Sequence, residues 1–249
     1  MNASLFEGQL ALVTGAGGGI GAAISRACAE RGASLVLTAR DREKLEAVRS
    51  SLPRPGEHHL VPADLTHDGE LHRLCQAVLD LARKNPLGVL VLNAGAALNA
   101  SIEETTVEQW DGLFAINARA PFLLVKHLLP ALRANPRPGG PRIIAIGSVV
   151  STEAYVDQGA YSASKHALYG LTRVLAKELH RDGSRIQVHS VHPGGVDTDM
   201  IRAVRPDIDG THLIGPGEIA QIVGSLLDLQ GNAMVEEVRI RRRAREPWA

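Results

Sequence analysis

The 249-residue chain is poor in aromatic residues and carries no net charge. Phe, Trp and Tyr make up only 3% of it, and 27 Lys and Arg balance 27 Asp and Glu, so neither base stacking nor electrostatic attraction to nucleic acid or an acidic membrane is favoured. No run approaches the ~18 apolar residues of a membrane-spanning helix, and the start MNASLFEG lacks the basic segment of a signal peptide. We therefore expect a cytoplasmic protein that binds neither nucleic acid nor membrane.

Cysteine is scarce as well. Cys28 and Cys75 both fall in segments with helical periodicity. With two cysteines and no export signal, free buried thiols are expected rather than a disulfide. His189 and His192 lie close together in the chain, but no carboxylate cluster or Cys/His spacing accompanies them, so we expect no metal site.

Short runs rich in Val, Ile and Leu alternate with longer amphipathic segments along the whole chain. The apolar runs predict strands buried on both faces, at residues 10–14, 34–39, 59–63, 88–94, 142–148, 186–192 and 235–240. Helical spacing is clearest in residues 20–32, 67–84 and 167–179, the last with Leu168, Leu171, Val174, Leu175 and Leu179 on one face. This alternation predicts one α/β domain over residues 1–249, a doubly wound parallel sheet with helices on both faces.

Two further stretches stand apart from this alternation. Residues 199–215 follow a strand and include Pro206, Gly210 and Gly215, so they are expected to form a substrate lid. Residues 241–249 form a basic C-terminal tail, which without interleaved aromatic residues is expected to be solvated or to contact another subunit.

The run TGAGGGIG, residues 14–21, follows a predicted strand and opens a predicted helix. Gly15 can form the tight turn at the strand end, and Gly19 and Gly21 lie where backbone must approach a diphosphate or pack closely. The helix N-terminus supplies unpaired N–H groups for phosphates. A plain strand-to-helix loop that uses glycine for its turn is the alternative, and the rest of the chain decides between them.

The spacing Thr14-Gly15-x-x-x-Gly19-x-Gly21 resembles the T-G-x-x-x-G-x-G loop of the short-chain dehydrogenase/reductase family. The chain continues with the family's other motifs in order, with Leu92 in place of the first Asn of N-N-A-G: ADLT (63–66), LNAG (92–95), IN (116–117), IGS (146–148), YSASK (161–165) and HPGGVDT (192–198). This resemblance spans nearly the whole chain. It implies a Rossmann-like fold and an NAD(P)-dependent oxidoreductase.

The resemblance also implies site residues. The implied catalytic residues are Ser148, Tyr161, Lys165 and Asn117. The implied cofactor-binding residues are Thr14, Gly15, Gly19, Ile20, Gly21, Arg40, Asp64, Leu65, Asn93, Ala94, Gly95, Tyr161, Lys165, Pro193, Gly194, Val196 and Thr198. In the family, the counterpart of Lys165 also holds the nicotinamide ribose, that of Asn117 holds a water of the proton relay, and that of Asp64 contacts the adenine.

The chemistry of these residues fits hydride transfer between a carbonyl and a secondary alcohol. Tyr161 and Lys165 lie four apart on a predicted helix and share a face. We expect the ammonium to lower the tyrosine pKa from its usual ~10, which makes Tyr161 a general acid and base. Ser148 can donate a hydrogen bond to the carbonyl oxygen. A cofactor-binding regulatory protein without catalysis is the alternative, and the intact four-residue set argues against it.

Cofactor choice depends on the end of the second strand. An NAD enzyme of this type usually has an acid at the position of Ala39. The next residue, Arg40, suits the 2′-phosphate of NADP(H), with Arg42 assisting, whereas Asp41 is expected to cap a helix rather than bind ribose. We expect NADP(H), with an NAD-dependent alcohol or hydroxy-acid dehydrogenase as the alternative.

The partners expected are a small carbonyl or alcohol substrate and further copies of the chain. Residues 96–101, 149–155, 194–195 and 199–215 are expected to border the substrate, with a mostly small and apolar lining. Family members mostly assemble through the helix that carries Tyr-x-x-x-Lys, and here that helix is apolar enough to bury more than one face. A homotetramer or homodimer is therefore expected.

Overall fold

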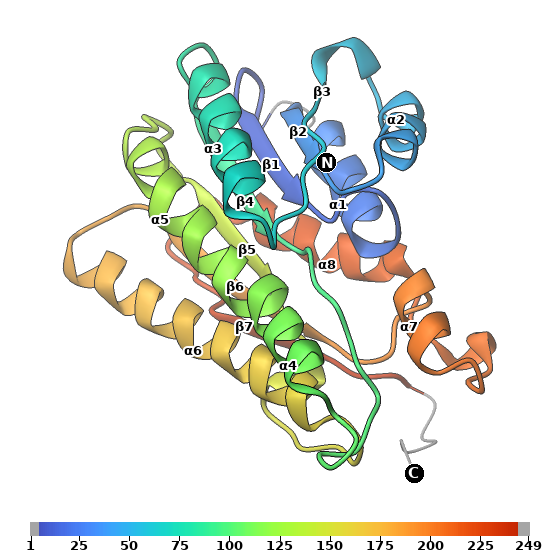
Figure 1. Ribbon diagram of the computed structural model, residues 1–249. Helices are drawn as coiled ribbons and strands as arrows, with labels where there is room; N and C mark the ends of the chain where they lie inside the picture. Colours follow the sequence, from blue (N-terminus) through green and yellow to red (C-terminus); the bar gives the residue numbers. More distant parts are fainter. Residues whose placement is uncertain (1–4, 244–249) are drawn as a thin grey trace.

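A seven-stranded parallel sheet forms the centre of the computed structural model, which describes residues 5–243 (Figure 1). The strand order is β3-β2-β1-β4-β5-β6-β7, and every neighbouring pair is parallel. The strands are β1 (Leu10–Thr14), β2 (Ser34–Thr38), β3 (His59–Leu60), β4 (Leu87–Leu92), β5 (Arg142–Ile146), β6 (Gln187–Pro193) and β7 (Glu237–Ile240). The Rossmann-like doubly wound fold predicted from the sequence is confirmed.

All seven predicted strands are present, and the third is shorter than expected. Only His59 and Leu60 pair as a strand with β2, although Val61 still donates its N–H to the Leu37 carbonyl. Ala63 also donates its N–H to the Ala39 carbonyl, so hydrogen bonds to the chain after β2 continue beyond Pro62. The remaining predicted strands agree to within about two residues at each end, the usual uncertainty of a boundary.

Helices cover both faces of the sheet (Figure 1). One face is covered by α1 (Gly19–Glu30), α2 (Arg42–Ser51) and α8 (Pro216–Asp228), the other by α3 (Asp68–Ala82), α5 (Ala120–Arg133) and α6 (Gly159–Arg181). Helix α4 (Val107–Phe114) runs into α5 through a π-helical stretch, Ala115–Arg119. The short helix α7 (Asp199–Val204) lies beyond the carboxyl end of β6.

The two-sided cover explains the composition of the strands. In β1, Ala11 and Val13 pack into the core under α1 and α8, whereas Leu10 and Leu12 pack into the core under α3 and α5. Both sets are apolar, so the strand shows no polar alternation.

Helix α6 differs in one detail from the face expected for it. Leu168, Leu175 and Leu179 are buried as expected, but Val174 is 55% exposed. Because residue 174 immediately precedes Leu175, it is turned about 100° from the buried stripe of the helix.

The continuous helix from Val107 to Arg133 is long and apolar enough, by length and composition, to cross a membrane. Helices in the core of an α/β domain pass the same test. Leu124, Leu128 and Leu132 on it are buried in the core beneath the sheet.

The two cysteines are free and buried, as predicted. Burial raises the pKa of the Cys28 thiol to about 12 and that of Cys75 to about 11. Neither thiol is therefore a nucleophile at neutral pH.

Candidate active site

A cavity of about 480 Å³ lies at the carboxyl edge of the sheet. Strands β2 and β4 lie there on opposite sides of β1, so the strand order reverses at this point. This is the switch point at which doubly wound sheets bind ligands. Of the site residues predicted from the sequence, the cavity is lined by Gly15, Gly19, Ile20, Arg40, Asn93, Ala94, Gly95, Ser148, Tyr161, Lys165, Pro193, Gly194, Val196 and Thr198. Thr14, Gly21, Asp64, Leu65 and Asn117 lie outside that lining.

The glycine loop forms an open cradle at one end of the cavity. Gly15 and Gly19 have φ angles of 65° and 52°, in the left-handed region that favours glycine. A Cβ at Gly15 would lie 2.8 Å from the Asn93 Nδ2, and one at Gly19 would lie 2.8 Å from the Thr198 Cγ2. Helix α1 begins here with Gly18 at its N-cap and no side-chain cap, so its first N–H groups are left for a ligand.

Thr14 and Gly21 support this cradle from behind. The Thr14 hydroxyl donates to the Val91 carbonyl at 3.0 Å and accepts the N–H groups of Asn93 at 2.9 Å and Ala94 at 3.0 Å, which joins the ends of β1 and β4. A Cβ at Gly21 would lie 2.1 Å from the Gly15 carbonyl oxygen, so α1 can approach the loop only because residue 21 has no side chain.

Ser148 follows the end of β5 and caps the 3₁₀ turn Val149–Ser151. Its N–H donates to the Ser151 hydroxyl at 3.0 Å, and its own hydroxyl accepts the Val150 N–H at 3.4 Å. The Ser148 hydroxyl also contacts the Tyr161 hydroxyl, which comes from the first turn of α6. Two residues from separate elements are thereby brought together at one point on the cavity wall.

Tyr161 and Lys165 lie one turn apart on α6, as expected, but their titration differs from the expectation. Burial raises the pKa of the Tyr161 phenol, and the contact with Ser148 lowers it by less. The expectation that the Tyr161 pKa lies below its usual ~10 is therefore wrong in this structure, because burial outweighs the other effects. Burial also lowers the pKa of Lys165 to about 8, and its Nζ donates to the Ile146 carbonyl at 3.0 Å. At neutral pH Tyr161 is thus a protonated phenol and Lys165 is mostly charged.

Asn117 is fully buried in the π-helical stretch between α4 and α5. Its Oδ1 accepts the Ala96 N–H at 3.0 Å, and its Nδ2 donates to the Ala96 carbonyl and to the Ser164 hydroxyl, both at 2.9 Å. The side chain therefore fastens the loop after β4 to α6 and is fully used. The main-chain carbonyl of Asn117 cannot accept the usual hydrogen bond of an α-helix from residue 121, because Pro121 has no N–H. The role of Asn117 in holding a relay water stays a prediction.

Four charged side chains line the other end of the cavity: Arg40, Asp41, Lys44 and Asp199. Arg40 lines it as predicted, and Asp41 caps α2 by accepting the N–H groups of Glu43 at 2.9 Å and Lys44 at 3.1 Å. Lys44 also lines the cavity, whereas Arg42 does not. The sequence motifs do not point to Lys44, but its place in the first turn of α2 directs its side chain back over the strand end.

Asp64 and Leu65 are not brought to the cavity lining. Asp64 Oδ1 accepts the Thr66 N–H at 2.9 Å and the Thr66 hydroxyl at 2.7 Å, which closes a turn before α3. In this structure Asp64 is thus a turn residue near the cavity rather than one that lines it.

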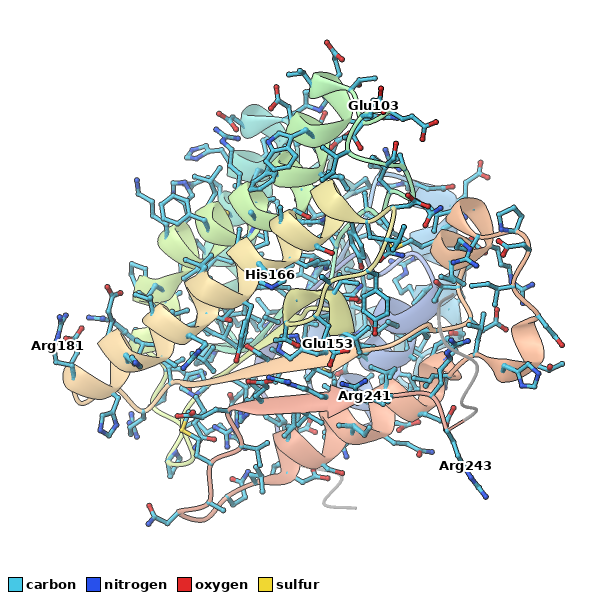
Figure 2. The ribbon with its side chains drawn as sticks, turned by 90° about the horizontal axis from the view of Figure 1, so that it is seen from below. Glu103, Glu153, His166, Arg181, Arg241 and Arg243 are labelled. Atoms are coloured by element: carbon cyan, nitrogen blue, oxygen red, sulfur yellow. The ribbon has the colours of Figure 1, made fainter. Side chains whose placement is uncertain are left out.

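The segments predicted to border the substrate contribute to the rest of the cavity wall. Ala97, Leu98, Val149, Val150, Tyr155, Gly194, Gly195, Met200, Ile201 and Val204 come from those segments, and Gln158 is an addition. The Tyr155 hydroxyl donates to Glu153 at 3.2 Å, and Glu153 pairs with Arg241, beside it in Figure 2. Arg241, which directly follows β7, thus holds the segment before α6 through an ion pair. Residues 244–249 of the predicted basic tail lie outside the described residues.

The two histidines of β6 serve separate hydrogen bonds. His189 Nδ1 lies 2.5 Å from the Val235 carbonyl, and His192 Nδ1 lies 3.2 Å from the Ser148 carbonyl. Within residues 5–243, no three potential metal-ligating side chains lie together.

Comparison with known proteins agrees with this geometry. The family model described as short chain dehydrogenase matches residues 9–209. The chain belongs to the short-chain dehydrogenase/reductase family. It is 37% identical over 202 residues, 80% of this chain and 77% of the relative, to the rhamnolipids biosynthesis 3-oxoacyl-[acyl-carrier-protein] reductase of Pseudomonas aeruginosa. It is 32% identical over 233 residues to an uncharacterized oxidoreductase of Staphylococcus epidermidis, with 94% of this chain and 96% of that one covered.

Solved structures of family members match nearly the full length of this short-chain dehydrogenase/reductase. The Pseudomonas aeruginosa RhlG/NADP active-site complex superposes with a TM-score of 0.84 at 33% identity, and covers 97% of each chain. A metagenomic short-chain oxidoreductase in complex with NADP superposes with a TM-score of 0.80 at 33% identity, over 97% of this chain and 100% of that one.

Proposed function

We propose that this short-chain dehydrogenase/reductase interconverts a ketone or aldehyde and the corresponding secondary alcohol, with NADP(H) as cofactor and Tyr161 as the general acid and base. The observation that carries the proposal is the contact between the Ser148 and Tyr161 hydroxyls on the cavity wall, one helical turn from the buried Lys165.

The residues present fit a dinucleotide with a 2′-phosphate. Gly15, Gly19 and the uncapped N-terminus of α1 leave room and N–H groups for a diphosphate. Arg40 and Lys44 lie at the same end of the cavity and carry positive charge toward it. Solved relatives in complex with NADP support the same cofactor. When bound, the cofactor supplies the hydride.

The chain's own residues would act on the substrate oxygen. Ser148 and Tyr161 hydroxyls donate hydrogen bonds to the carbonyl oxygen and stabilise the negative charge that develops on it. Tyr161 then gives its proton to that oxygen during reduction, and takes one from the hydroxyl in the reverse direction. The positive charge of Lys165 stabilises the phenolate that Tyr161 forms.

Gly95 leaves space for this arrangement behind the reacting groups. A Cβ at Gly95 would lie 2.8 Å from Asn117 Oδ1 and 3.3 Å from Lys165 Nζ. A methyl group there would displace Asn117 Oδ1 and crowd Lys165 Nζ. The glycine of LNAG therefore keeps both side chains in place.

The substrate end fits a carbonyl compound with an apolar substituent. Leu98, Val150, Met200, Ile201 and Val204 make up much of its wall. Helix α7, at the start of the predicted lid at 199–215, forms one side of that wall, so its movement would open or cover the substrate. The Pseudomonas relative is named for 3-oxoacyl substrates, which have such a ketone beside an alkyl chain.

A homodimer or homotetramer in the cytoplasm completes the proposal. Trp110 on α4, Phe122 on α5 and Val174 on α6 are 42%, 46% and 55% exposed, on three helices of the same side of the sheet. Apolar side chains in this number on neighbouring helices suit contact with a second copy of the chain.

A carbonyl panel tests the proposed function. Purified protein is incubated with NADPH or NADH and with aldehydes, cyclic ketones and 3-oxoesters such as ethyl acetoacetate, and cofactor oxidation is followed at 340 nm. Turnover of at least one ketone with NADPH is expected. Binding of NADPH without turnover of any carbonyl compound, or of any secondary alcohol with NADP⁺, would contradict the proposal and favour a cofactor-binding protein without catalysis.

A further inference from the structure

His192 lies at the carboxyl end of β6, directly behind the turn that carries Ser148, and is 1% exposed. We propose that His192 is a positioning residue for Ser148: its ring Nδ1–H holds the Ser148 carbonyl and thereby sets the orientation of the Ser148 hydroxyl. The inference rests on the proposed catalytic role of Ser148. His192 does not line the cavity, so it acts through Ser148 rather than on the substrate.

Strand β6 holds the turn at two points. The Gly147 N–H donates to the Val191 carbonyl at 2.8 Å, and His192 Nδ1 lies 3.2 Å from the Ser148 carbonyl oxygen. A carbonyl oxygen only accepts hydrogen bonds, so Nδ1 must carry the hydrogen, which fixes the tautomer of the ring. The peptide units before Gly147 and after Ser148 are thereby both fixed to the same strand.

The histidine ring packs directly against the backbone of this turn. A Cβ at Gly147 would lie 2.6 Å from His192 Nδ1 and 2.9 Å from the Ser151 hydroxyl. The Ser151 hydroxyl in turn accepts the Ser148 N–H at 3.0 Å. His192 and Ser151 therefore enclose the turn from two sides, and only a glycine at 147 allows both contacts.

The other face of the ring is held by α6. The Tyr169 ring stands edge-on to His192 with centroids 4.9 Å apart and an interplanar angle of 88°. The Tyr169 hydroxyl bonds to Glu237 of β7, which also accepts from Arg239 at 2.5 Å. The ring is thus enclosed between the turn and Tyr169 and cannot move toward solvent without disturbing one of them.

Packing alone does not explain a histidine at this position. The Nε2 of His192 is buried with no hydrogen-bond partner among residues 5–243. Burying an unpaired polar atom is unfavourable, so an apolar side chain of similar size would suit the space better. Among residues 5–243, the one hydrogen bond that the ring makes is the bond to the Ser148 carbonyl, and we attribute the histidine to that bond.

Three variants at one position separate the hydrogen bond from packing. In His192→Asn the amide nitrogen can take the place of Nδ1 and keep the bond to the Ser148 carbonyl. In His192→Gln the amide nitrogen reaches the place of Nε2 instead, so that bond is lost. His192→Leu fills the space without any donor. We expect Leu and Gln to lower kcat at least tenfold with NADPH and ethyl acetoacetate, or the best ketone of the panel. Asn should stay within threefold of wild type. The KM for NADPH and the Tm should stay near wild type in all three.

Two results would overturn the inference: a wild-type kcat in His192→Leu, or a kcat in His192→Asn as low as in His192→Leu. Ser148→Ala is the reference variant. If Ser148→Ala keeps wild-type turnover, the proposed function itself fails. If Ser148→Ala is slow while His192→Leu is not, only the role of His192 fails.

A double-mutant cycle covers the case in which His192→Leu does not fold. Gly147→Ala places a methyl group against the ring, so it should lower kcat in the wild-type background. In the His192→Ala background the ring is absent, and the same substitution should cost at least threefold less. An equal loss of kcat in both backgrounds would show that the ring does not transmit the change, and the inference would be wrong.

Discussion

Cofactor preference should depend on Arg40 and Lys44 and not on Arg42. Arg40 and Lys44 line the end of the cavity proposed to hold the adenosine, whereas Arg42 lies between them in the chain but outside the lining. A charge-assisted hydrogen bond to a phosphate is worth about 1.5–3 kcal/mol, or about 10- to 150-fold. Lys44 is 57% exposed and already pairs with Asp199 at 3.2 Å, so we expect the lower end of that range for it.

The assay compares kcat/KM for NADPH and NADH in wild type and in three alanine variants. Wild type should prefer NADPH. Arg40→Ala and Lys44→Ala should each reduce the NADPH-to-NADH ratio about tenfold or more by raising the KM for NADPH, because only the phosphate contact is lost. Arg42→Ala, the matched control, should leave the ratio within twofold. A wild-type preference for NADH, or an equal effect of all three substitutions, would refute the assignment of the 2′-phosphate site.

Three further predictions concern the catalytic lysine, the glycine cradle and assembly. The pKa of Lys165 is lowered to about 8, so the kcat for carbonyl reduction should fall as pH rises through about 8. In Lys165→Arg this fall in kcat should move above pH 10. A wild-type kcat that stays constant from pH 7 to 9.5 would contradict the prediction. Gly21→Ala should lower the free energy of unfolding by at least about 2 kcal/mol in urea, because its Cβ would lie 2.1 Å from the Gly15 carbonyl oxygen. The control Gly69→Ala, in an open position of α3, should gain up to about 1 kcal/mol, and similar losses in both would refute the steric argument. Light scattering at micromolar concentration should give a particle of at least twice the chain mass, and a 26.5 kDa particle would contradict the proposed oligomer.

The strands and the glycine cradle could be predicted because they follow from local sequence. A strand covered on both faces has to be apolar throughout, and the loop TGAGGGIG needs residues without side chains at Gly15, Gly19 and Gly21. The N-cap role of Asp41 is local in the same way, since the bonds it accepts come from residues two and three positions on. The sheet order follows from the resemblance to a known family rather than from any one segment.

Properties that depend on burial could not be predicted. The expected effect of Lys165 on Tyr161 considered only their spacing on a helix, whereas the pKa of each is governed by desolvation in the assembled cavity. The Asn117 side chain bonds to Ala96 and Ser164. Both partners come from distant segments of the chain, so the motif around Asn117 does not reveal them. The sequence does not reveal Lys44 as a cavity residue, because only the folding of α2 brings it back over the strand end beside Arg40.

The role of Tyr161 is the central claim, and one variant tests it most directly. Tyr161→Phe removes the phenol hydroxyl and keeps the ring, so NADPH binding, measured by fluorescence titration, should stay within about threefold of wild type. Single-turnover reduction of the best ketone of the panel should fall by about 100-fold or more, as expected when a general acid is removed. Retention of more than about one tenth of the wild-type rate would show that the proton comes from elsewhere and would contradict the account.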